Sequence, residues 1–107
     1  MSIAIMACRK AMGKCSATGC FKAYNKSTAA FEIYGDNKEE LVSFFYCSGC
    51  GETLSPNENW KHKISQLKKN NVRIIHISHC VMSKCDDYKK HGRILEKEGF
   101  KVIYGTH

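Results

Sequence analysis

The sequence predicts a single α/β domain over residues 1–107, a small three-layer fold in which an open parallel sheet of four strands has helices on both faces. Four short apolar runs alternate along the chain with segments whose apolar residues recur at helical spacing. Each strand-to-strand connection is long enough for a helical crossover, and such crossovers are right-handed. The length is also typical of one hydrophobic core. We predict the strand order 2-1-3-4.

The first half of the chain contains two of the predicted strands. Residues 3–7 form an apolar run that ends at Cys8, and a basic loop then leads to a helix over residues 16–26. Residues 29–34 predict a further helical turn, which a glycine and a polar segment end. The second strand covers residues 41–46. This strand is nearly apolar on both faces, which is typical of a strand that helices cover on each side.

The second half opens with a clear helix-start signal. Ser55 is followed by a proline at the first helical position and by a glutamate at the third, which together form a capping box. Residues 72–78 are mostly apolar and predict the third strand. Ser83 or Asp86 can cap the last helix, which a glycine ends. Residues 101–104 then form the fourth strand.

Composition and charge narrow the classes of protein to consider. Hydrophobic residues make up 43% of the chain and charged residues 25%, as in an ordinary soluble globular protein. No apolar run approaches the roughly 20 residues that a membrane-spanning helix needs. The apolar amino terminus has no basic segment in front of it, so it predicts a strand rather than a signal peptide. We therefore expect a cytoplasmic protein without a membrane partner.

The net charge of +7 raises the possibility of a nucleic-acid partner. Most of the lysines fall on predicted helices that also carry an apolar stripe, which is the pattern of a solvated outer face. No basic run is interleaved with the stacking aromatic residues that single-strand binding requires. We favour the solvated face, and nucleic-acid binding through these helices is the weaker hypothesis.

The cysteine and histidine content is the strongest compositional signal. Seven cysteines and five histidines are far more than packing requires, and an odd number of cysteines cannot pair completely within one chain. Without a secretion signal, the thiols are expected to be reduced. In a reducing compartment this density of cysteine indicates metal binding or redox chemistry more than a disulfide framework.

Each predicted strand ends at a thiol or an imidazole. The carboxyl ends of parallel strands meet at one edge of the sheet, where ligands bind in open α/β folds. The strand ends supply Cys8, Cys47, His79-Cys80 and His107, and the loops that follow add further cysteines. The candidate metal ligands are Cys8, Cys15, Cys20, Cys47, Cys50, Cys80, Cys85 and His107.

If the cysteines at this edge lie close together, they cannot all ionise easily without a cation among them. Several thiolates raise one another's pKa values unless a positive ion lies among them. Zinc takes four sulfur or nitrogen ligands, and Cys47-Ser48-Gly49-Cys50 has the spacing that lets both sulfurs reach one ion. Cys80 and Cys85 form a second pair on a predicted loop. The predicted helix starts several residues after Cys50, which favours metal binding over thioredoxin-like disulfide exchange.

The ligand count leaves alternatives open. More donors are present than one four-coordinate ion can use, which allows a second metal, an iron–sulfur cluster or reactive thiols beside a structural site. Zinc is the leading cofactor, and an iron–sulfur or thiol-redox protein or enzyme is the alternative. His76 lies within a strand, where packing is the simpler interpretation. His62 and His91 lie on helices, where surface or partly buried roles suffice.

The sequence also resembles a known family. The resemblance spans nearly the whole chain and rests on Cys8 after the first strand, the Cys-x4-Cys-Phe-Lys-Ala segment over residues 15–23, Phe31 and Tyr34 before Gly35, Cys47-Ser48-Gly49-Cys50, His79-Cys80 and Gly105-Thr106-His107. On these residues the chain is similar to the CGGC domain family, which is named for a central Cys-Gly-Gly-Cys. Ser48 replaces the first glycine of that motif, and serine still permits a turn. The resemblance implies zinc binding by the cysteines and histidines, and it implies no particular catalytic activity.

Overall fold

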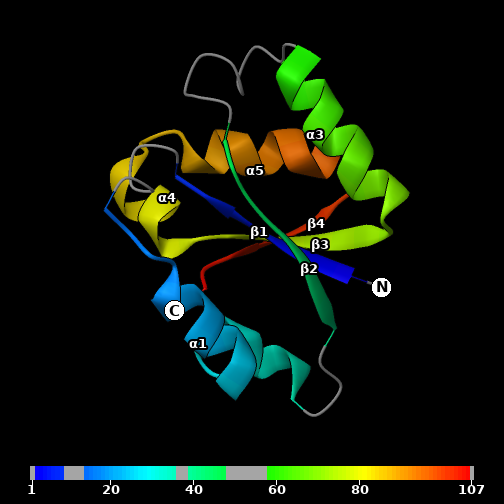
Figure 1. Ribbon diagram of the computed structural model, residues 1–107. Helices are drawn as coiled ribbons and strands as arrows, with labels where there is room; N and C mark the ends of the chain where they lie inside the picture. Colours follow the sequence, from blue (N-terminus) through cyan, green and yellow to red (C-terminus); the bar gives the residue numbers. More distant parts are fainter. Residues whose placement is uncertain (1, 9–13, 36–38, 48–57, 107) are drawn as a thin grey trace.

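The computed structural model describes residues 2–8, 14–35, 39–47 and 58–106. Within these ranges four parallel strands form one sheet in the order β2-β1-β3-β4 (Figure 1). The strands are β1 (Ser2–Ala7), β2 (Glu40–Tyr46), β3 (Val72–Ile77) and β4 (Lys101–Tyr104). The predicted strand order is confirmed.

Helices cover both faces of the sheet, as predicted. Figure 1 shows α3 and α5 on one side and α1 on the other. The helices are α1 (Thr18–Lys26), the 3-10 helix η1 (Ala29–Tyr34), α3 (Glu58–Lys69), α4 (His79–Lys84) and α5 (Tyr88–Lys97). Among the described helices, none combines the length and the apolar character needed to cross a membrane. The predicted capping box before α3 lies outside the described residues.

The central strand β1 divides the core into two layers. Alternate side chains of a strand point to opposite faces, so Ile3 and Ile5 pack toward α1 and η1, whereas Ala4 and Met6 pack toward α3 and α5. All four side chains are fully buried. On the α3 side they join a cluster built around the indole of Trp60. The apolar run at the amino terminus is therefore the centre of the fold.

The chain after β3 differs from the sequence-based expectation. The third strand ends at Ile77, and α4 begins at once at His79, with Ser78 as its N-cap residue. The carbonyl of Ser78 accepts helical hydrogen bonds from Val81 and Met82, at 3.1 and 3.3 Å. The predicted loop around Cys80 and Cys85 is therefore wrong: Cys80 lies in the first turn of α4.

The N-cap of the last helix is also corrected. Helix α5 begins at Tyr88 with Asp87 as its N-cap residue, rather than with Ser83 or Asp86. Ser83 lies within α4, because that helix occupies the segment that was expected to be a loop. In α5 the backbone amides of Lys90 and His91 donate to the Asp87 carbonyl, at 2.9 and 3.1 Å.

Candidate metal centre

Two cysteines follow the adjacent strands β1 and β2. The amide of Cys47 donates to the Ala7 carbonyl over 3.2 Å, which continues the strand pairing to the point where both chains leave the sheet. Cys8 is 7% exposed and Cys47 is 8% exposed, and both belong to the core cluster on the α3 side. Partly buried Cys80 and Cys85 pack against the same cluster. Cys8, Cys47 and Cys80 therefore follow the carboxyl ends of β1, β2 and β3, and Cys85 lies at the end of α4.

The sulfur of Cys80 has two polar partners. The backbone amide of Cys8 donates to Cys80 Sγ over 3.3 Å, although the two residues lie far apart in the sequence. The hydroxyl of Ser78 lies 2.8 Å from the same sulfur. Sulfurs that accept amide and hydroxyl hydrogen bonds are typical of metal-bound thiolates, because these bonds orient the ligand and offset part of its charge.

Cys20 lies on the other side of the sheet, on α1. It is 4% exposed, belongs to the core cluster on the α1 side, and donates its thiol hydrogen to Thr106 Oγ1 over 3.3 Å. The same hydroxyl oxygen accepts the His79 amide at 3.4 Å. Thr106 thus connects the chain after β4 to the starts of α1 and α4.

The surroundings of Cys20 oppose ionisation of its thiol. Burial raises the pKa of Cys20 above its ordinary value, and the neighbouring Cys80 and Cys15 raise it further, while the hydrogen bond with Thr106 acts in the opposite direction. Like charges that share a small volume disfavour one another's formation.

The predicted ligands Cys15, Cys50 and His107 remain to be placed, and the position of Cys85 in its helix can be given. Cys15 is exposed, with its sulfur 3.3 Å from the Ala17 amide, and Cys85 is the C-cap residue of α4. Cys50 and His107 lie outside the described residues. Within the described ranges, no three His, Cys, Asp or Glu side chains are close enough to hold a metal ion together. The described residues alone therefore do not form a metal site.

A buried aromatic network holds the segment that carries Thr106. His76 Nδ1 lies 3.0 Å from the Gly105 carbonyl, which can only accept, so this nitrogen carries the proton. His76 Nε2 then accepts the Tyr34 hydroxyl over 2.7 Å. Phe31 packs on the imidazole at a centroid distance of 4.4 Å. Burial is the main cause that raises the pKa of Tyr34 to about 12. His76 is thus a core residue, as predicted.

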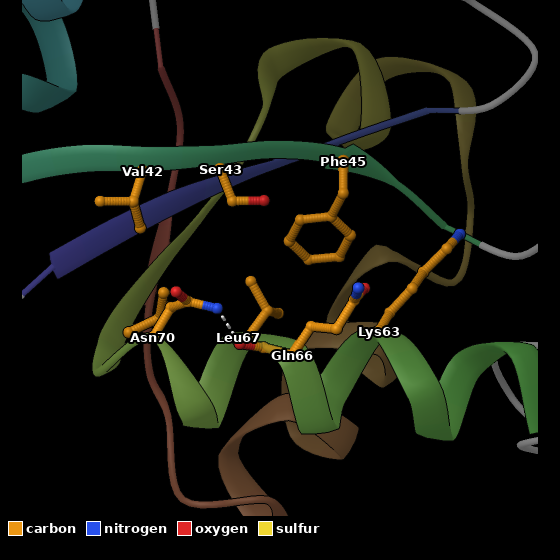
Figure 2. Close-up of a pocket in the computed structure, with 8 residues that line it drawn as sticks. Val42, Ser43, Phe45, Lys63, Gln66, Leu67 and Asn70 are labelled. Carbon is orange, nitrogen blue, oxygen red and sulfur yellow. Dashed lines mark hydrogen bonds between the residues drawn. The ribbon is translucent and has the colours of Figure 1, made fainter.

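A pocket of about 280 Å³ opens at a different part of the sheet edge, between β2 and α3 (Figure 2). Apolar side chains such as Phe45 and Leu67 line it, together with Lys63 and Gln66 of α3 and Asn70 just after that helix. Its lining contains no cysteine or histidine.

Sequence reasoning missed two hydroxyl residues of the site, Ser78 and Thr106. Both are fully buried and both contact a cysteine sulfur. The available signal was their position, because each is a polar residue within two positions of the end of an apolar strand. That signal gives the edge of the sheet, but it does not identify the sulfur that each hydroxyl contacts.

Comparison with known proteins gives a family match and a relative of similar length. The sequence model of the CGGC domain matches residues 2–107. An uncharacterized protein of Methanocaldococcus jannaschii is 32% identical over 120 aligned residues, which cover 100% of this chain and 87% of that relative. No solved structure shows a significant match to the chain. The match to the family over nearly the whole chain shows that this protein belongs to the CGGC domain family.

Proposed function

We propose that this protein binds a metal ion, zinc in the first place, through thiolates at the carboxyl edge of its sheet. The observation that carries the proposal is the sulfur of Cys80, which lies within 3.3 Å of the Cys8 amide and 2.8 Å of the Ser78 hydroxyl, beside the thiols of other segments. Membership of the CGGC domain family supports a metal-binding role. Zinc suits this set because it prefers thiolate and imidazole ligands.

The position of each cysteine relative to the core cluster on the α3 side divides the eight candidate ligands. Four of these cysteines pack in or against a single core cluster, and the other described candidates lie across the sheet or on the approach to α1. The proposed ligands are Cys8, Cys47, Cys80 and Cys85, with Cys15, Cys20, Cys50 and His107 as the remaining candidates. The site needs reduced thiols, so we infer a reducing compartment such as the cytoplasm.

Metal analysis of anaerobically purified protein tests the proposal. We expect bound zinc, no visible colour, and a loss of thermal stability when a chelator removes the ion, because metal affinity is linked to folding. Broad visible absorption with bound iron would instead support an iron–sulfur cluster at the same edge. Protein that holds no metal after anaerobic purification, and takes up none on reconstitution, would contradict both.

A substitution at Cys47 examines the ligand set directly. Cys47→Ser keeps the size of the side chain but removes a thiolate, so we expect less bound zinc and a smaller melting-temperature difference between metal-loaded and chelator-treated protein. The comparison between the two preparations of one variant serves as the internal control, because a packing defect alone lowers both melting temperatures. Unchanged zinc content and an unchanged difference would exclude Cys47 as a ligand.

A further inference from the structure

The backbone of Ser78 is held by two elements, and its hydroxyl lies beside the sulfur of Cys80. The Ser78 side chain is fully buried, its amide donates to the Met6 carbonyl over 2.9 Å, and its carbonyl accepts the first hydrogen bonds of α4. Because β1 and α4 both hold its backbone, the direction of its hydroxyl is restricted. That hydroxyl lies 2.8 Å from the sulfur of Cys80.

We propose that Ser78 is a positioning residue for the metal, which acts through Cys80. This inference rests on the proposed metal-binding function. A metal-bound thiolate carries no proton, so the short contact between the two side chains requires the serine hydroxyl to be the donor. The Cys8 amide supplies a second donor from another strand end, at 3.3 Å. Together the two donors aim the sulfur and leave a lone pair for the ion.

The expected effect of Ser78 follows from the charge on the acceptor. Hydrogen bonds to an ionised group are about twice as strong as neutral ones, and the Ser78 partner of this bond is fully buried. Loss of an outer partner of a metal ligand typically lowers metal affinity by about 10- to 100-fold. Ser78 should therefore influence the affinity of the site without contacting the ion.

Ser83 offers a matched control on the same helix. Its hydroxyl is exposed and donates to the backbone carbonyl of Cys80 over 3.4 Å, so it contacts the same residue but not the sulfur. Ser83→Ala removes one serine hydroxyl from α4, whereas Ser78→Ala removes the one that faces the thiolate. A difference between these variants isolates the contact with sulfur.

The experiment is a titration of reduced, metal-free protein with cobalt(II), followed through the thiolate-to-cobalt charge-transfer bands and by competition with zinc. We expect Ser78→Ala to weaken affinity about 10-fold or more, while Ser83→Ala and Ser78→Thr, which keeps a hydroxyl at the position, retain the wild-type affinity. In a Cys80→Ala background, Ser78→Ala should have no further effect, because such a cycle measures the coupling of the pair.

The possible failures are distinguishable. An unchanged affinity of Ser78→Ala overturns the inference and leaves the metal-binding proposal standing. If Ser78→Ala lowers the metal affinity equally in the wild-type and Cys80→Ala backgrounds, Ser78 acts only by supporting the fold. That result also overturns the inference. Wild-type protein that binds neither cobalt nor zinc overturns the proposed function and this inference with it. Circular dichroism of each metal-free variant verifies that the affinities compare folded proteins.

Discussion

Two buried hydroxyl groups give two cysteines different surroundings. Ser78 lies beside the sulfur of Cys80, which also accepts an amide, whereas Thr106 accepts the thiol hydrogen of Cys20. Cys80 is partly exposed and Cys20 is buried. At the scale of single residues the cysteines are therefore not equivalent: the sulfur of Cys80 acts as an acceptor, and the thiol of Cys20 remains a donor in the absence of metal.

The role of Thr106 can be measured through stability. Thr106→Val keeps the shape of the side chain but removes the acceptor of the Cys20 thiol and the His79 amide. We expect the free energy of unfolding of metal-free protein to fall by about 1–2 kcal/mol, because a buried hydrogen bond is lost without replacement by water. Urea denaturation gives the value.

The control for that measurement is Thr18→Val. The Thr18 hydroxyl pairs with Ser16 Oγ at 2.6 Å on the surface, where water can replace it. Its loss should change the free energy of unfolding by no more than about 0.5 kcal/mol. Equal effects at the two threonines would show that the contact with Cys20 contributes nothing to stability.

At the scale of elements, α5 approaches β4 through a residue without a side chain. A Cβ at Gly92 would lie 2.1 Å from the hydroxyl oxygen of Tyr104 and 2.9 Å from the ring carbon that bears it. Tyr104 in turn packs edge-on against Tyr88, at a centroid distance of 5.8 Å. A helix-interior glycine normally weakens a helix, so its presence here is explained by the space that the tyrosine ring occupies.

This packing predicts that Gly92→Ala changes the free energy of unfolding in opposite directions with and without the Tyr104 ring. Gly92→Ala alone should lower the free energy of unfolding by about 1–3 kcal/mol, because the new methyl group collides with the ring. In a Tyr104→Ala background the same substitution should instead raise it by up to about 1 kcal/mol, through the better helix propensity of alanine. Denaturant titration of the four proteins tests the coupling, and the same effect in both backgrounds would contradict the described contact.

The burial of the edge strand β2 could not be predicted from its apolar sequence. Its apolar sequence predicted cover on both faces, yet Val42 is 42% exposed and Tyr46 is 46% exposed. The strand lies at one edge of the sheet, and β1 is its only neighbour among the strands in the described ranges. Aromatic and β-branched residues are common in edge and central strands alike, so the pattern predicts the strand and not how far neighbours cover it.

At the scale of the whole molecule, two histidines are buried in different parts of the core. His76 lies in β3 and His91 in α5, and within the described residues no partner is found for Nδ1 of His91. Burial lowers the pKa of both below the ordinary value of 6.5; the bond to Gly105 acts against this for His76, as the charge of Asp87 does for His91. Both are therefore neutral in the folded protein at neutral pH.

Stability of the metal-free protein should therefore fall as the solution is made acidic. Below pH 6.5 the unfolded chain takes up protons on these histidines while the folded chain does not, so the free energy of unfolding decreases as the pH falls toward the lowered folded pKa values. Urea denaturation between about pH 7.5 and 5 tests this. His91→Leu should reduce the slope, and replacement of the exposed His62 by glutamine should not. An unchanged slope in His91→Leu would refute the assignment for that residue.

Much of the fold and part of the site could be predicted before the structure was known. The strands follow from the apolar runs, and the predicted strand order agrees with the structure. The placement of Cys8, Cys47 and Cys80 after the carboxyl ends of three parallel strands follows from the strand positions. Helix α4 was not predicted, because its six residues are too few for a helical period to be visible in the sequence.

The sequence by itself determined the fold class and the edge of the sheet at which cysteines follow the strands, because periodicity is a local property that marks where each strand ends. Only the tertiary structure decided that Cys20 and Cys80 lie beside different hydroxyls, that His76 is held by Tyr34 and Gly105, and that Gly92 makes room for Tyr104. These contacts join residues far apart in the chain, and ångström-scale packing of several elements sets them.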